Sequence, residues 1–175
     1  FEKINSYLIE AKKKGLLREN TFVVFPEHIG TALVLLGEKN EVYAANTVSS
    51  AFSKIAIGDL ISYLKTSFLN PNKSSGEVIF KMKASNMKKV YVDTFGKLSR
   101  LYGVTILAGS ILLPEPEIEE SQNDIILKNG SILNASFLFL PDGKINLKFG
   151  VKHNLAAMER QIAIGRIPEN AFLIH

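Results

Sequence analysis

A long apolar run that ends in a tight turn constrains this chain more than any other feature. Residues 131–140 read Ser-Ile-Leu-Asn-Ala-Ser-Phe-Leu-Phe-Leu, a composition typical of a β-strand. Residues 141–144 (Pro-Asp-Gly-Lys) follow, and the Asp-Gly pair is characteristic of a hairpin turn. We expect residues 144–151 to return as the second strand. This hairpin has to join a sheet, so an all-helical fold is not expected.

Helical and strand-like segments alternate along the rest of the chain. The spacing of apolar residues predicts helices near 2–14, 53–69 and 86–102, and further strands near 21–25 and 104–110. This alternation indicates the α/β class. We expect a layered sandwich in which helices cover one face of a mixed sheet.

Four segments are read from composition alone. Residues 32–36 fit either a buried helix or a strand, residues 37–40 are typical of a turn, and residues 70–76 are typical of a loop. Residues 114–124 contain two prolines and five acidic residues, which predicts an exposed excursion. The aromatic residues of the helix near 86–102 recur at helical spacing, so a core stripe explains them better than a nucleic-acid surface. That stripe comprises Tyr91, Phe95, Leu98 and Tyr102.

Composition limits the classes of function. With 175 residues and 46% hydrophobic content, the chain can bury a core and suits one domain. A net charge of +4 is too mild to indicate nucleic acid as a partner. Cysteine is absent, and the three histidines lack metal-ligand spacing, so neither a metal nor a cofactor is expected. The apolar runs are too short for a membrane span and no signal peptide opens the chain, which favours a cytoplasmic location.

Glu27 is the first candidate catalytic residue. It follows Pro26, which ends the apolar strand near 21–25 because proline cannot donate to a ladder. Ligands bind at the carboxyl ends of strands in α/β folds, and a partly desolvated carboxylate there suits general-base work. The alternative is an ordinary loop glutamate that caps a helix. The small residues at 108–110, which close another strand, would let a ligand or a neighbouring backbone approach closely.

Lys152 is the second candidate, at the far end of the hairpin. It can be a plain surface lysine or a cation that stabilises a developing oxyanion. If the strands ending at Phe25 and Val151 lie parallel in one sheet, Glu27 and Lys152 should converge at the same edge. We expect their charged groups within a few ångströms.

The order of these motifs resembles the first half of the nitrilase superfamily, the carbon–nitrogen hydrolases. The motifs are Phe25-Pro26-Glu27, Tyr102-Gly103, Ala108-Gly109-Ser110, Asn134-Ala135, the Pro-Asp-Gly-Lys turn, and Lys152-His153-Asn154-Leu155. The resemblance implies an α-β-β-α sandwich, a Glu-Lys-Cys triad and a small amide or nitrile substrate. Glu27 matches the family glutamate, Lys152 is the nearest match to its lysine, and Glu159 is the candidate for its second glutamate.

The chain also departs from the family pattern. His153 follows Lys152 directly, which leaves Lys148 as an alternative lysine, and neither the family's cysteine nor its first strand is present. The resemblance therefore implies that residues 1–175 are one incomplete domain. It would be completed by the rest of the fold or by another chain, and a homo-oligomer is expected. The alternatives are a non-catalytic, degenerate nitrilase-like interaction module or an acyltransferase of the same superfamily.

Overall fold

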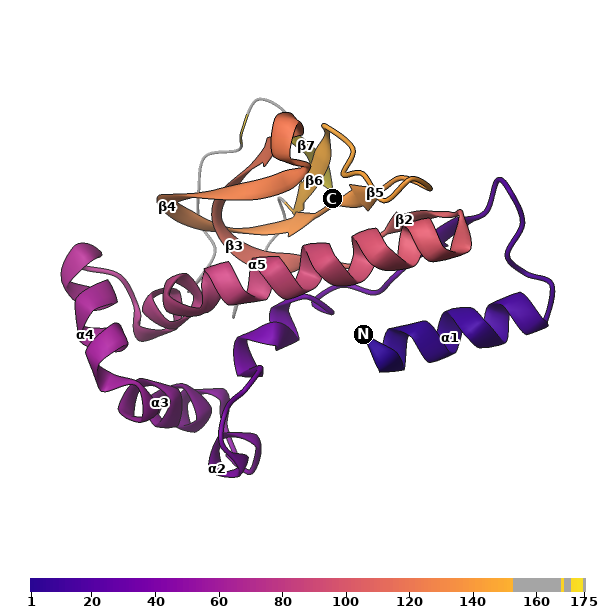
Figure 1. The fold of residues 1–175 in the computed structure, drawn as a ribbon. Coiled ribbons are helices and arrows are strands. Elements are labelled where there is room, and N and C mark those ends of the chain that lie inside the picture. The colour runs from indigo at the N-terminus through magenta and orange to yellow at the C-terminus, as the bar shows by residue number, and fades with distance from the viewer. Residues whose placement is uncertain (153–167, 169–170, 175) are drawn as a thin grey trace.

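Two mixed sheets lie on one side of a long helix in the computed structural model, which describes residues 1–152, 168 and 171–174 (Figure 1). The described elements, with η for a 3-10 helix, are α1 (Glu2–Lys13), β1 (Phe22–Val24), η1 (Thr31–Leu35), α2 (Asn40–Tyr43), α3 (Val48–Gly58), α4 (Leu60–Leu69), α5 (Ser75–Tyr102), β2 (Thr105–Leu107), β3 (Ile111–Glu119), η2 (Glu120–Gln122), β4 (Asp124–Ser136), β5 (Leu138–Phe139), β6 (Phe149–Lys152) and β7 (Ala171–Ile174). The α/β class expected from the sequence is confirmed.

The strands form one sheet in the order β1-β2-β5 and a second in the order β3-β4-β6-β7. In the first sheet β1 and β2 are parallel, and β5 is antiparallel to β2. In the second, β3, β4 and β6 are antiparallel neighbours, and β7 is parallel to β6. The chain passes between the sheets three times: once between β5 and β6, and at two points that lie next to each other, residues 108–110 and Phe137. A hydrogen bond from Ala108 N to Phe137 O, 3.1 Å long, joins these two crossing points.

The expected strand over residues 131–140 is interrupted at the second crossing. It runs to Ser136 as part of β4 and resumes as β5 in the other sheet. The buried ring of Phe137 stacks on Phe149 at 4.8 Å, so burial of this side chain accompanies the bend. The turn itself is confirmed, because Leu140 N donates to Lys144 O at 2.8 Å and Gly143 has φ +84°. The returning strand is shorter than expected, with a single bridge from Phe139 to Ile145 before β6 begins.

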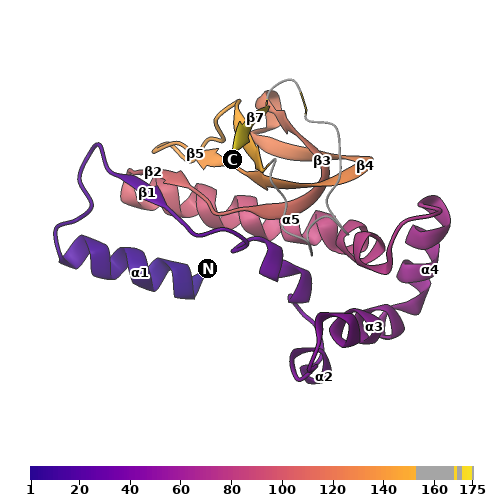
Figure 2. The same ribbon diagram turned by 180° about the vertical axis from the view of Figure 1, so that it is seen from behind.

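Helix α5 packs against both sheets and carries the centre of the core (Figures 1 and 2). Tyr91, Phe95 and Leu98 are buried along it, which confirms the core stripe, although Tyr102 is only partly buried. The helix ends at Gly103 with φ +62°, the left-handed conformation that glycine adopts most readily. Helix α1 lies beside its carboxyl-terminal end, where Tyr102 Oη donates to Asn5 Oδ1 at 2.7 Å.

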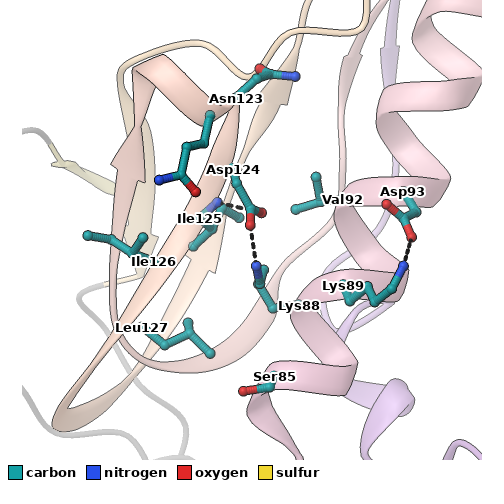
Figure 3. A pocket seen from close by; sticks show the side chains of 11 residues that line it. Ser85, Lys88, Lys89, Val92, Asp93, Asn123, Asp124, Ile125, Ile126 and Leu127 are labelled. Carbon is teal, nitrogen blue, oxygen red and sulfur yellow. Dashed lines mark hydrogen bonds and ion pairs between the residues drawn. The ribbon is translucent and has the colours of Figure 1, made fainter.

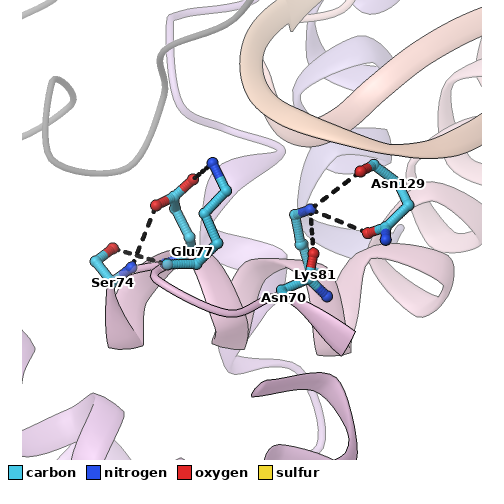
Figure 4. A network of polar contacts seen from close by, with 6 residues as sticks. Asn70, Ser74, Glu77, Lys81 and Asn129 are labelled. Atoms are coloured by element: carbon cyan, nitrogen blue, oxygen red, sulfur yellow. Dashed lines mark hydrogen bonds and ion pairs between the residues drawn. The ribbon is translucent and has the colours of Figure 1, made fainter. Parts of the chain in front are cut away.

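The start of α5 differs from expectation, because the helix begins at Ser75 rather than near residue 86. Ser74 and Glu77 form a capping box in which each side chain accepts from the other's backbone N–H (Figure 4). Lys81 ties this end of the helix to β4, since Nζ donates to Asn70 Oδ1 at 2.6 Å and to Asn129 Oδ1 at 3.0 Å. Burial lowers the pKa of Lys81 below its ordinary value.

The helix expected over residues 53–69 is two helices, α3 and α4, which meet at Asp59. The Asp59 side chain accepts from Ser62 N at 3.2 Å and so caps α4. The expectation that this segment covers a sheet is wrong. Its helices contact α5 and extend away from the sheets with α2, as an arm that both views show (Figures 1 and 2).

Residues 114–124 correct a further expectation, because only Glu120–Gln122 are exposed and most of the segment belongs to β3. Pro114 and Pro116 are buried in β3, which pairs with β4 along most of its length. The register shifts between the two prolines, where Glu115 has φ +35°. A bulge of this kind accommodates proline, because the residues around it leave the regular hydrogen-bonding pattern.

Candidate active site

The loop after β1 lies directly against the segment that crosses between the sheets. His28 N donates to Ser110 Oγ at 2.9 Å, and Gly30 N donates to Ser110 O at 3.0 Å. A Cβ atom on Gly109 would lie 1.7 Å from Pro26 O, so only glycine allows this approach. The expectation that small residues at 108–110 admit a neighbouring backbone is confirmed.

Tyr91 holds the crossing segment from the core side. Its hydroxyl donates to Gly109 O at 2.7 Å and lies 3.1 Å from Ala108 O. The side chain is fully buried, and burial raises the pKa of Tyr91 well above its ordinary value. The neutral hydroxyl therefore remains a donor at physiological pH. Its hydrogen bond holds the backbone at Gly109, which lies against Pro26, the residue before Glu27.

Glu27 and Lys152 meet at this point. Lys152 Nζ lies 2.8 Å from Glu27 Oε1. The expected convergence is observed, but the expected reason for it is wrong, because β1 and β6 belong to different sheets. The two residues meet where the chain crosses between the sheets. Lys152 ends β6, which pairs with β4 on one side and β7 on the other.

Asn134 is a third member of the site. It lies in β4 opposite Leu112, and its Nδ2 donates to Glu27 Oε1 at 3.1 Å. Only 1% of Asn134 is exposed, so its amide donates to the carboxylate from a buried position rather than from the surface. Sequence reasoning noted the Asn134-Ala135 motif without assigning Asn134 a role. The available signal was an amide within an apolar strand, since asparagine is depleted from strands.

His28 completes the surroundings of the carboxylate. Its Nε2 lies 3.7 Å from Glu27 Oε1, and its Nδ1 lies 3.3 Å from Thr31 Oγ1. The backbone at His28 has φ +64°, which is uncommon for a residue with a side chain. This conformation accompanies the tight turn that carries the chain from β1 over Ser110 into η1.

A small cavity of about 260 Å³ opens over the pair. Its lining includes Phe25, Glu27, Leu107, Ala108, Gly109, Ser110, Asn134, Ser136 and Lys152. The Glu27 side chain is 47% exposed and that of Lys152 is 24% exposed. The carboxylate is therefore less desolvated than the sequence led us to expect. It is also within reach of a small molecule.

A larger hollow of about 710 Å³ lies between α5 and β4 (Figure 3). The charged side chains of its lining already pair, Lys88 with Asp124 and Lys89 with Asp93. It contains neither Glu27 nor Lys152. We therefore locate the candidate chemistry at the smaller cavity.

The remaining sequence candidates lie elsewhere. Glu159 and His153 fall outside the described residues. Lys148 is exposed ahead of β6, where its backbone N donates to Asn146 Oδ1 at 3.0 Å, and it does not line the small cavity. In the part of the chain that the structure describes, no cluster of His, Cys, Asp or Glu could hold a metal ion, and no helix is long and apolar enough to cross a membrane.

Comparisons of this chain with models of protein families, with curated proteins and with solved structures found no match. The geometry of the residues around Glu27 is therefore the basis for a functional assignment. That geometry joins a carboxylate, an ammonium group and a buried amide at one cavity.

Proposed function

We propose that Glu27 and Lys152 form the acid–base and electrostatic part of a carbon–nitrogen hydrolase site of the nitrilase type. The observation that carries this proposal is the 2.8 Å contact between Lys152 Nζ and Glu27 Oε1 at a cavity open to small molecules. In the proposed enzyme the two sheets and α5 belong to an α-β-β-α sandwich. A thiol nucleophile comes from outside these 175 residues, which contain no cysteine.

The chemistry assigns a distinct task to each group. The Glu27 carboxylate accepts the thiol proton, and the thiolate attacks the carbonyl carbon of an amide. The Lys152 ammonium stabilises the negative charge that develops on the carbonyl oxygen. When the carbon–nitrogen bond breaks, Glu27 returns the proton to the leaving amine, and water then hydrolyses the thioester. Asn134 positions the carboxylate through its bond to Oε1.

The size of the cavity favours a small substrate. A volume of about 260 Å³ is at or below the lower end of typical ligand pockets, so it suits a compact acyl group or nitrile. Glu159 stays a candidate for placing the substrate or the water. The lack of cysteine favours a second candidate function, a non-catalytic interaction module that keeps the Glu27–Lys152 ion pair for structural reasons.

The test begins with the coding sequence beyond His175 and with any partner chain that co-purifies. We expect a cysteine there, and we expect the cysteine-containing protein to release ammonia from a panel of small primary amides and nitriles. Glu27→Gln should abolish turnover and preserve the fold, because the amide keeps the shape and loses the basicity. Lys152→Ala should reduce kcat about 10²–10³-fold, the scale of losing an oxyanion donor.

Lys148→Ala is the matched control, because this exposed lysine lies just before the same strand and away from the cavity. Its turnover should equal that of the unmodified protein. Full activity of Glu27→Gln would overturn the proposal, and so would amide turnover by the 175 residues alone. Absence of a cysteine in both the longer coding sequence and the partner would favour the interaction module.

A further inference from the structure

Two serine hydroxyls lie at the same cavity as Glu27 and Lys152 and have no role in the proposed hydrolysis. Ser110 and Ser136 both line this cavity of about 260 Å³. Ser110 is 4% exposed, and its Oγ accepts a hydrogen bond from His28 N at 2.9 Å. A hydroxyl donates one hydrogen bond in addition to those that it accepts. Among the residues that the structure describes, neither serine hydroxyl donates to a protein atom, so both hydrogens are available to a ligand.

The pairing of the strands brings the two serines level with each other. Strand β3 pairs with β4 at Ile111 and Ala135. Ser110 precedes the first of these residues and Ser136 follows the second, so antiparallel pairing places them side by side. On the other side of β4, the partner of Ser136 is Gly150, which has no side chain to cover the Ser136 hydroxyl.

Ser136 also shares a face of β4 with the amide that contacts Glu27. Alternate residues of a strand point to the same side. Asn134, two residues before Ser136, donates to Glu27 Oε1 at 3.1 Å. Two residues of a strand span about 7 Å. A substrate amide held at Glu27 therefore brings a substituent on its neighbouring carbon atom within hydrogen-bonding reach of Ser136.

We propose that the Ser110 and Ser136 hydroxyls bind an oxygen substituent on the carbon atom next to the substrate amide, so that the site prefers 2-hydroxy amides to plain aliphatic amides. A substrate hydroxyl both donates and accepts, as the serine hydroxyls do. A site built to bind a substrate hydroxyl rejects the analogue without it, because the buried polar groups of the site then lack a partner. This inference rests on the proposed function, since Glu27 and Lys152 have to hold the amide.

The rest of the lining agrees with a short acyl group. Phe25, Leu107 and Ala108 form the apolar part of the cavity. They can contact the carbon atoms of the substrate while the hydroxyls contact its oxygen. Few polar groups among apolar ones are typical of ligand sites, because the polar groups fix the orientation of the ligand.

The test compares glycolamide with propionamide, two primary amides in which a hydroxyl in one replaces a methyl group in the other. Ligand-observed NMR measures their binding to the purified protein, and binding requires no nucleophile. We expect glycolamide to bind at least about tenfold more tightly than propionamide, the scale of a hydrogen bond in a buried site. Ser136→Ala should remove most of this preference and leave the affinity for propionamide little changed. Ser136→Thr keeps a hydroxyl and should keep the preference, which provides a second measurement if the alanine variant does not fold.

Ser131→Ala is the matched control, because Ser131 is a half-buried serine of the same strand that does not line the cavity. It should keep the full preference, and circular dichroism should show that the variants are folded. Equal binding of the two amides to the unmodified protein would overturn the proposal, and so would the absence of binding by either amide. A Ser136→Ala protein that loses affinity for both amides alike would also overturn it, because the hydroxyl would then contact the amide group itself.

The outcome is separate from that of the proposed hydrolysis. A protein that prefers glycolamide through Ser136 but has no cysteine partner and no turnover would support the binding preference and refute the hydrolase. A protein that hydrolyses both amides with equal kcat/KM and binds them equally would support the hydrolase and overturn the preference.

Discussion

At the scale of single residues, Gly109 decides whether the site can form. The Pro26 carbonyl occupies the space that a side chain at Gly109 would need, and Ile29 Cγ2 would lie 2.8 Å from the added Cβ. Gly109→Ala should therefore lower the free energy of unfolding by about 1–3 kcal/mol, the usual cost of overpacking. Urea unfolding followed by circular dichroism measures this change.

Gly58→Ala is the control, because a Cβ atom there meets nothing within 4 Å and the position lies at the end of α3. It should be neutral or stabilising by up to about 1 kcal/mol, since alanine favours helix. Equal stability of the two variants would show that the loop moves away from residues 108–110 at no cost.

At the scale of elements, the stability of α5 depends on its first turn, which precedes the buried residues Tyr91, Phe95 and Leu98 in the sequence. Ser74 and Glu77 satisfy backbone donors at the first turn, and Lys81 in the second turn joins the helix to β4. Ser74→Ala should lower the free energy of unfolding by about 1 kcal/mol, the typical loss of an N-cap. Ser53→Ala on α3 serves as the comparison, because the Ser53 hydroxyl only bonds back to Ser49 O and its loss should matter little. A Ser74→Ala protein as stable as the Ser53→Ala protein would contradict the role of the cap.

At the scale of the whole molecule, one face of the β1-β2-β5 sheet is left open. Phe22 and Val24 of edge strand β1 are 54% and 63% exposed on this face. On the opposite face, Ile106 of β2 and Phe139 of β5 are buried. We expect another chain or a further part of the fold to cover this face. The purified 175-residue chain should accordingly self-associate or bind an apolar fluorescent dye.

Phe22→Thr/Val24→Thr tests this prediction, since threonine keeps the preference for strand and removes apolar surface. This double variant and its parent should be compared in a background that carries Ile61→Ser and Phe68→Ser, so that these exposed apolar side chains of α4 do not contribute. The signal from the dye or from self-association should fall by about half or more, because the substitutions remove apolar surface. A monomeric chain that binds no dye would refute the idea.

The sequence determined the features that depend on neighbours along the chain. Helical spacing identified the buried stripe of Tyr91, Phe95 and Leu98. Gly103 marked the end of α5, and the Asp-Gly pair marked the turn before β6. The sequence also indicated that Glu27 and Lys152 lie at the ends of strands. Pro26 marked the end of the first strand, and the Asp-Gly turn marked the start of the segment that leads to the second. Their closeness was expected, although one shared sheet was the wrong reason for it.

Tertiary structure alone decided the crossing between the two sheets and the composition of the site around it. Asn134 and Glu27 are 107 residues apart, and Ser110 and His28 are 82 residues apart, so no local pattern reveals these contacts. The same holds for the buried prolines of β3 and for the outward apolar side of α4, whose sequence patterns suggested a loop and a covering helix. Hydrophobic periodicity records that a side can be buried, but packing against distant residues determines which side is buried.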